Sequence, residues 1–284
     1  MKGWRFALTR RWAGYLALAV AFAVVCVGLG AWQFDRRAQA RAEISRIESN
    51  YDRAPVPVSE ALGKFDSFEE SQKWLPVSLT GTYLSEHEVL VRNRPFAGRP
   101  GFEILTPMRL TDDTVFIVDR GWLPTGSKQD APDVVPAAPT GEVTVTARLR
   151  EGEPLLPGRT SVEGSGQIAT AHLPQLAEMI DEPTYTGAYG LIATPGANPG
   201  SVPTESLRPT LDEGPHLSYA LQWYVFAIIG FFGLGWALRQ EYRAVNSDEP
   251  EERDRAEERA RRKAAKAPTD SESEDAIIEA LERR

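Results

Sequence analysis

The sequence predicts a multi-pass membrane protein in which two transmembrane α-helices flank one extracytoplasmic, antiparallel β-rich α+β domain. Residues 13–32 and 217–238 carry no charged side chain, and each stretch is roughly 30 Å long as a helix, enough to cross the hydrocarbon core of a bilayer. Between them, short runs alternate apolar and polar residues and are separated by Gly, Pro and Asp, which is typical of β-strands. We expect five parts: a cytoplasmic N-terminus (1–11), a first span (12–34), the β-rich domain (35–216), a second span (217–238) and a charged cytoplasmic tail (239–284).

The first span could instead be a cleaved signal peptide, because basic residues precede it and residues 38–40 (Ala-Gln-Ala) resemble a cleavage site. Its apolar stretch is longer than the usual core of about 7–15 residues in signal peptides. Three charged residues, Asp35, Arg36 and Arg37, also separate that stretch from the candidate site. We therefore expect an uncleaved anchor.

Basic residues near the spans predict the orientation, because Lys and Arg are enriched on the cytoplasmic side. The terminal flanks hold nine of them: Lys2, Arg5, Arg10, Arg11, Arg239, Arg243, Arg253, Arg255 and Arg259. The inner flanks hold five: Arg36, Arg37, Arg41, Arg46 and Arg208. We expect a protein of the cell membrane with both termini in the cytoplasm.

Charge and cysteine content exclude two function classes. Residues 35–216 carry 17 basic and 26 acidic side chains, so this domain offers no electrostatic basis for binding nucleic acid. Cys26 is the only cysteine and lies inside the first span. The chain therefore has no disulfide and too few soft ligands to carry copper by itself.

The segments between the spans are predicted in order from their patterns. Residues 35–48 continue the first helix outward until prolines stop it, and residues 59–70 suggest a short second helix. Residues 143–150 alternate apolar and polar side chains as a half-buried strand does. Further strands are expected at 74–83, 87–93, 102–110, 114–122 and 185–193, a helix at 172–180, and loops at 124–141 and 195–215. The tail beyond residue 239 is dense in Glu and Arg, which indicates disorder or a solvated helix.

Four ordered blocks resemble a known family. Residues 30–37 (GAWQFDRR) are similar to the GxWQxxRR signature of the SURF1 family of cytochrome c oxidase assembly factors. The other blocks are 91–95 (VRNRP) with 100–107 (PGFEILTP), 118–124 (VDRGWLP) and 216–224 (HLSYALQWY). Their order and the two-anchor topology agree with that family across residues 12–238, whereas the long charged tail departs from it.

The resemblance implies a chaperone-like assembly factor for the respiratory chain. It would assist the insertion of haem a into the catalytic subunit of a haem-copper aa3-type cytochrome c oxidase, or stabilise that subunit, binding haem a only transiently. The alternative is a stable accessory subunit of a respiratory oxidase or supercomplex without its own cofactor. The residues show no nucleophile elbow, zincin motif or dinucleotide fingerprint, so we expect no enzyme activity.

Six residues are candidates for binding the oxidase partner: Trp32, Gln33, Arg36, Arg37, Arg120 and Trp122. The first four lie at the outer end of the first span, where Arg is suited to carboxylates such as haem propionates. The alternative there is an interfacial aromatic with basic residues that reach lipid phosphates. For the block at 118–122 the alternative is structural, with Gly121 ending the strand and Trp122 covering the core.

His216, Tyr219 and Trp223 are the candidates for binding haem. On a helix they share one narrow face with Ala220 and Ala227, which would form an aromatic-and-small groove under an imidazole at the membrane surface. Imidazole is a common axial ligand of haem iron. The alternative is that His216 makes an interfacial contact. No metal site is expected elsewhere.

Small residues also predict helix contact in the membrane. Ala13, Ala17, Ala21 and Gly28 share one side of the first span, and Gly230, Gly233 and Gly235 notch the second. They could pair the spans with each other or with helices of the oxidase.

Overall fold

The computed structural model describes residues 3–127, 130–156, 158, 165–194, 203–264 and 278–279. The chain divides into two compact units. The first, which we call the helical unit, comprises Met1–Ala38 and Gly214–Arg284, and the second, the β domain, comprises Gln39–Glu213. Helix α1 (Arg10–Asn50) contributes to both units.

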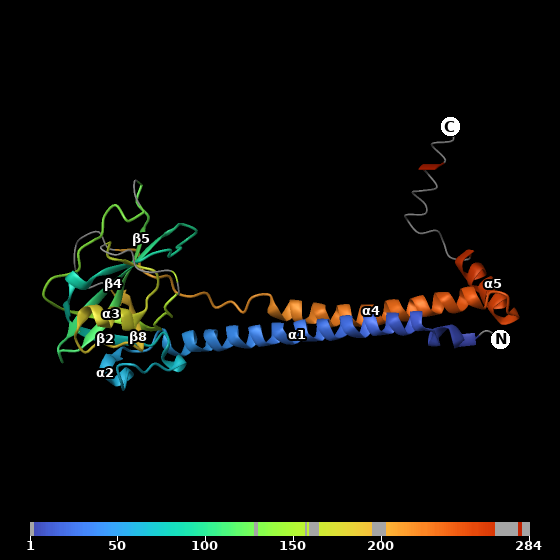
Figure 1. Cartoon of the computed structure of the whole chain (residues 1–284), viewed down its shortest axis with the longest axis horizontal. Helices are drawn as coiled ribbons and strands as arrows, with labels where there is room; N and C mark the ends of the chain where they lie inside the picture. Colours follow the sequence, from blue (N-terminus) through green and yellow to red (C-terminus); the bar gives the residue numbers. More distant parts are fainter. Residues whose placement is uncertain are drawn as a thin grey trace. The chain divides into compact units, whose positions relative to one another are not determined.

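Two long helices form the helical unit. The first part of α1 lies side by side with α4 (His216–Val245) (Figure 1). The two helices are antiparallel, since Gln33 bonds to His216 while Arg11 pairs with Glu241 at the other end. Both are long and apolar enough to cross a membrane. A 3₁₀-helix, η1 (Gly3–Leu8), precedes α1, and α5 (Pro250–Ala264) follows α4.

The two spans pack through a stripe of small residues that differs from the predicted one. Cys26 on α1 and Ala220 on α4 are fully buried, and Ala227 is nearly so. A Cβ added at Gly30 would lie 2.8 Å from the Tyr224 ring, so α1 needs glycine there. By contrast Ala13, Ala17, Ala21 and Gly28 are exposed. The predicted stripe on the first span therefore faces away from α4.

The β domain is a closed barrel rather than a purely antiparallel sheet. The closed ring runs β2–β6–β8–β5–β4 and returns to β2, and β1, β3 and β7 extend it at the edges. Most pairs are antiparallel, but β5–β8, β1–β2 and β3–β7 are parallel, which corrects the prediction. The strands are β1 (Val56–Pro57), β2 (Pro76–Tyr83), β3 (Val89–Val91), β4 (Gly101–Leu110), β5 (Val115–Pro124), β6 (Glu142–Glu151), β7 (Gln167–Ile168) and β8 (Ala188–Thr194).

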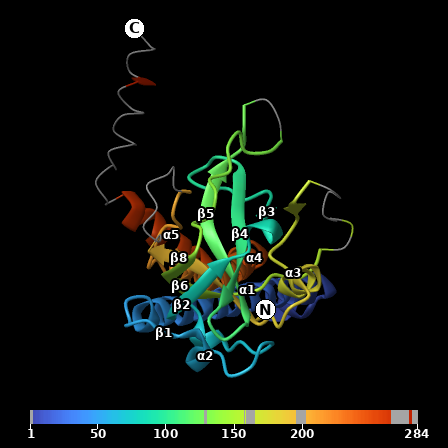
Figure 2. The same cartoon turned by 90° about the vertical axis from the view of Figure 1, so that its left-hand side faces the viewer.

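Strand β5 is buried on both faces, and this arrangement explains its continuous apolar run. One face packs inside the barrel, where Phe116 and Val118 meet residues of β2 and β6. The other face, with Val115 and Ile117, packs under α3 (Leu173–Ile180) and the end of α1, where Ile47 lies. Figure 2 shows α3 beside β3 and β4.

Several local predictions are confirmed and others are wrong. Residues 35–48 do continue the first helix, and the strand and helix at 143–150 and 172–180 are present within one residue or so. The helix predicted at 59–70 is wrong, since these residues form only α2 (Val58–Ala61) and part of η2 (Glu70–Gln72). No sequence pattern is long enough to predict the short strands β1 and β7 or the turn η3 (Ser85–His87). The tail forms α5 as far as Ala264.

Candidate functional site

A hydrogen bond joins the two predicted site segments. His216 is the first residue of α4, and its Nδ1 lies 2.8 Å from Oε1 of Gln33 on α1. The antiparallel packing of the helices brings these residues together from 183 positions apart in sequence. The first and fourth family blocks therefore form one site in the helical unit, which we call the Gln33–His216 site.

The Gln33 amide oxygen orients the imidazole of His216. With its carbonyl oxygen directed at His216, the amide accepts a hydrogen bond from Nδ1–H. A neutral imidazole protonated at Nδ1 keeps a lone pair on Nε2. Supporting hydrogen bonds of this kind orient histidines that ligate metals. The pair thus presents one nitrogen atom able to coordinate iron.

The face of α4 below His216 is not an open groove. Ala220 and Ala227, which were expected to form its floor, are buried, and α1 approaches α4 so closely that Phe34 lies 6.2 Å from Tyr224 between ring centroids. Tyr219 is half exposed at the edge of this contact, and Trp223 contacts Phe226 at 5.8 Å. A flat ligand would therefore meet the flank of the helix pair, where Tyr219 lies, rather than its interior.

The aromatic and basic residues of the first block follow the same helix. Trp32 is half exposed, and the Arg36 guanidinium lies 6.0 Å from its ring centroid, a cation–π contact. Arg37 lies one turn beyond Gln33, on the side of α1 that carries the hydrogen bond to His216. Two guanidinium groups are thus placed within about one helical turn of the Gln33–His216 site.

Arg120 lies inside the β domain and not beside the other candidates. Its side chain is 5% exposed and forms an ion pair with Glu88 at 2.8 Å. It also donates hydrogen bonds to Thr106 Oγ1 at 2.9 Å and to the Pro136 carbonyl at 2.7 Å. Through these contacts the guanidinium links β4, β5 and the loop at Pro136.

Trp122 is also buried, and Gly121 does not end the strand as expected. The Trp122 indole donates to the Arg94 carbonyl at 2.7 Å and stacks on Phe96 at 5.2 Å. Strand β5 continues to Pro124 because its last three residues pair with β4, and Gly121, at φ +122°, lies where Thr204 pairs with Trp122. A Cβ at Gly121 would lie 2.6 Å from the Thr204 carbonyl oxygen, so only glycine fits.

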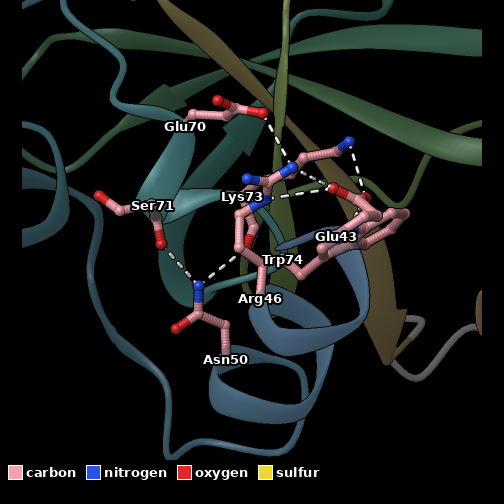
Figure 3. Close-up of polar contacts among 7 residues, drawn as sticks. All are labelled: Glu43, Arg46, Asn50, Glu70, Ser71, Lys73 and Trp74. Atoms are coloured by element: carbon pink, nitrogen blue, oxygen red, sulfur yellow. Dashed lines mark hydrogen bonds and ion pairs between the residues drawn. The ribbon is translucent and has the colours of Figure 1, made fainter. Parts of the chain in front are cut away.

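A second polar cluster, absent from the predicted site, attaches α1 to the barrel (Figure 3). Glu43 accepts hydrogen bonds from Trp74 Nε1 and Arg46, and its carboxylate pairs with Lys73 at 2.8 Å. Asn50 donates to the carbonyls of Ser71 and Lys73, which fixes the last turn of α1. We call Glu43, Arg46, Asn50, Lys73 and Trp74 the anchor cluster. Burial raises the pKa of Glu43, but the hydrogen bonds from Lys73, Trp74 and Arg46 outweigh it and lower the pKa to about 2.

A third, partly buried cluster lies in the β domain. Arg94 pairs with Glu103 at 2.9 Å and with Glu153 at 2.5 Å. Asp119 lies close enough to feel the charge of Glu103, and its Oδ1 accepts a hydrogen bond from Gly121 N at 2.8 Å. Among the described residues Asp119 Oδ2 has no hydrogen-bond partner. Burial, reinforced by Glu103, raises the pKa of Asp119 well above its ordinary value.

The described residues contain no group of three or more His, Cys, Asp or Glu side chains that could hold a metal ion. The helical unit instead offers a single imidazole, that of His216, beside two arginines. A ligand that brings most of its own metal coordination, as a macrocycle does, matches a single imidazole better than a bare ion would.

The fold and the site define a β-barrel domain inserted between two long apolar helices that meet at a histidine–glutamine contact. Comparison with known proteins identifies the family to which this arrangement belongs. A model of the SURF1 family matches residues 20–228. The chain belongs to the SURF1 family.

Proteins from several organisms are similar to this chain. A SURF1-like protein of Mycobacterium tuberculosis (strain H37Rv) is 34% identical over 237 residues, which cover 81% of this chain and 86% of that protein. A SURF1-like protein of Monosiga brevicollis is 27% identical over 251 residues, 78% of this chain and 87% of its own. The cytochrome oxidase assembly protein SHY1 of Saccharomyces cerevisiae is 28% identical over 120 residues, 42% of this chain and 30% of that protein.

Proposed function

We propose that this protein is a membrane-anchored assembly factor for an aa3-type cytochrome c oxidase, and that it assists the transfer of haem a to the catalytic subunit or stabilises that subunit before haem arrives. Family membership and the name of the yeast relative support the link to oxidase assembly. The observation that carries the haem proposal is the Gln33–His216 hydrogen bond. The role is transient binding and requires no catalysis.

The residues of the site fit haem a. His216 Nε2 would take the iron, because Gln33 occupies Nδ1. Arg36 and Arg37 would hold the propionates, since guanidinium groups match carboxylates in shape and charge. Haem a, when bound, brings the redox-active iron that the oxidase needs. The site's own task would be to hold and orient that group and then release it.

Release requires that the site bind haem less firmly than the oxidase does. One protein nitrogen on iron and a flank formed by the half-exposed Tyr219, with Trp223 one turn further along α4, give a smaller contact than an enclosed pocket would. A site that would hold haem a through His216 alone suits a carrier, because the partner protein could then reach the exposed part of the bound group. Ala220 and Ala227 are buried, so their face of α4 is closed to a ligand. A ligand would therefore bind at the exposed flank of the helix pair.

The partner surface would comprise the outer end of the helix pair. Trp32, Gln33, Arg36 and Arg37 lie there on α1, and the oxidase catalytic subunit would contact them from within the bilayer. Arg120 and Trp122 would contribute indirectly, by holding the barrel wall that the partner contacts, because both are buried. Both termini would lie in the cytoplasm, as the excess of terminal basic residues predicts.

The test measures haem per purified protein from cells that make haem a. His216→Ala should lose most bound haem, and Trp223→Ala should lose less, because it removes packing contact and leaves the iron–nitrogen bond. Ser218→Ala is the matched control, since Ser218 lies in the same turn and, among the described residues, its hydroxyl bonds to the Pro215 carbonyl alone. Equal haem in wild type and His216→Ala, at comparable membrane levels, would rule out the ligand role.

A further inference from the structure

A basic cavity lies where the apolar part of α4 ends. Arg239 follows the last apolar residue of the predicted span, and Arg243 lies one turn further along the helix. Helix α5 brings Arg255 and Arg259 to the same place. The four arginines line one cavity of about 440 Å³, which we call the arginine cavity.

The cavity holds more positive charge than its own residues neutralise. Glu252 is the one acidic residue among those that line it, and it pairs with Arg255 at 3.0 Å and Arg259 at 3.5 Å. Arg243 contacts the neutral Gln240 amide at 3.3 Å. Within the described part of the chain, Arg239 makes no hydrogen bond or ion pair. An anion with several acceptor oxygens would satisfy these donors, and phosphate is such a group.

The walls of the cavity are fixed by packing. Trp4 of η1 stacks on Tyr242 with ring centroids 4.4 Å apart, and the Gly3 amide donates to Asn246 Oδ1 at 3.1 Å. Asn246 in turn donates to the Tyr242 carbonyl at 2.8 Å. The Glu252 side chain is 8% exposed, and its ion pairs hold α5 in place. Helices α4 and α5 and the N-terminal η1, which is distant from them in sequence, thus build the arginine cavity.

An apolar groove of about 530 Å³ adjoins the cavity on the same helix. Ile228, Phe231, Phe232 and Trp236 line it, and it shares Gly235 and Arg239 with the arginine cavity. A Cβ at Gly235 would meet nothing within 4 Å, so no other side chain covers the helix at this shared position. An apolar groove that leads into a basic cavity complements an amphiphile with an acyl chain and an anionic head.

We propose that the arginine cavity and its groove form a binding site for an anionic phospholipid, with the phosphate among Arg239, Arg243, Arg255 and Arg259 and an acyl chain along Phe232 and Trp236. Basic pockets at the ends of transmembrane helices bind such headgroups. A lipid is favoured over free phosphate because the groove lies within the apolar span. This site goes beyond the proposed function and shares with it only the membrane location of α4.

The test titrates the full-length protein in detergent with two lipids of the same acyl chains, dimyristoyl phosphatidylglycerol and dimyristoyl phosphatidylcholine, and counts bound lipid by native mass spectrometry. Phosphatidylglycerol should bind at least about tenfold more tightly, which is about 1.4 kcal/mol. Arg239→Gln combined with Arg243→Gln should remove that preference. Trp236→Ala should weaken the binding of both lipids.

Arg253→Gln combined with Arg261→Gln is the matched control, because it removes two arginines from α5 that do not line the cavity. It should bind phosphatidylglycerol as wild type does. Equal binding of the two lipids by wild type, or equal losses in both double variants, would overturn the proposal. Displacement of phosphatidylglycerol by an equal concentration of inorganic phosphate would also overturn it, in favour of a free-phosphate site. None of these results bears on haem or the oxidase.

Discussion

Glu43 shows how one side chain can attach a helix to a barrel. Its carboxylate receives Lys73 and Trp74 from the segment that leads into β2, and Arg46 from its own helix. These donors hold its pKa at about 2, so the group is ionised at pH 7. This role cannot be predicted from the sequence, because Glu43 lies on a polar helical stretch that any solvated helix could contain.

We predict that Glu43→Gln destabilises the β domain by about 1–3 kcal/mol, because it leaves a partly buried Lys73 without its carboxylate partner and removes one of the two carboxylates that pair with Arg46, the other being Glu70. Thermal unfolding of the full-length protein at pH 7 measures the effect. The wild-type carboxylate stabilises the fold above its unfolded pKa of 4.5, and this contribution is lost as the pH falls from 4.5 toward 2. The difference between wild type and variant should therefore shrink in acid.

Glu48→Gln serves as the control for that measurement, since Glu48 is exposed on the same helix. It should change the unfolding temperature little. An equal loss of stability in Glu43→Gln and Glu48→Gln would show that the anchor cluster does not hold α1 to the domain.

Asp119 has the opposite electrostatic behaviour. Burial and Glu103 raise its pKa, so ionisation in the unfolded chain opposes folding at any pH above the ordinary aspartate value of 3.8. Asp119→Asn should keep the acceptor for Gly121 N and remove that cost. We predict that the variant is more stable than wild type at pH 7 and that the gain falls as the pH approaches 3.8. A variant less stable than wild type at pH 7 would contradict the assignment of Asp119 as a neutral buried acid.

At the scale of the element, helix α1 shows what a sequence pattern can and cannot decide. Its length, its apolar span and its continuation to residue 48 follow from composition and period. The face that meets α4 does not, because α1 contains several stripes of small residues. The stripe that packs includes Ala23, Cys26 and Gly30, and it leads directly to Gln33. A polar residue in register with small ones could have identified that face.

The barrel shows a different limit. Each long strand can be predicted from its apolar pattern, alternating in β6 and continuous in β5, but the closure of β4 on β2 and the parallel pairing of β5 with β8 join segments far apart in the chain. Their register depends on packing around Phe116, Val118 and Ala147, which a single strand does not reveal. The sequence therefore leaves two readings open for Arg120 and Trp122, partner binding or a structural role, and the burial of β5 on both faces favours the structural one.

The orientation of the two spans in the membrane is predicted from the basic residues that flank them. A reporter active only in the cytoplasm should be active when fused after Arg284 and inactive when inserted near Pro136, because the terminal flanks hold nine basic residues and the inner flanks five. The opposite pattern of activity would reverse the orientation.

The two units of the protein have separate tasks in the proposed function. The helical unit carries the Gln33–His216 site and the arginine cavity, and the anchor cluster fixes the β domain to the end of α1. The family blocks in the sequence predicted the first of these. The other two depend on residues that meet only in the folded chain, and the charged tail gave no hint that α5 would line a cavity.

The proposed role in oxidase assembly can be tested by the haem aa3 absorbance of membranes. The membranes come from a strain that lacks the gene and from the same strain carrying the wild-type gene or the His216→Ala variant. We predict that loss of the gene lowers spectrally visible oxidase while oxidase transcripts persist, that some oxidase remains, and that wild type restores more than His216→Ala. Purification of mature oxidase with one bound copy of this protein would favour the stable accessory subunit instead. Unchanged oxidase absorbance and respiration in the deletion strain would contradict the account.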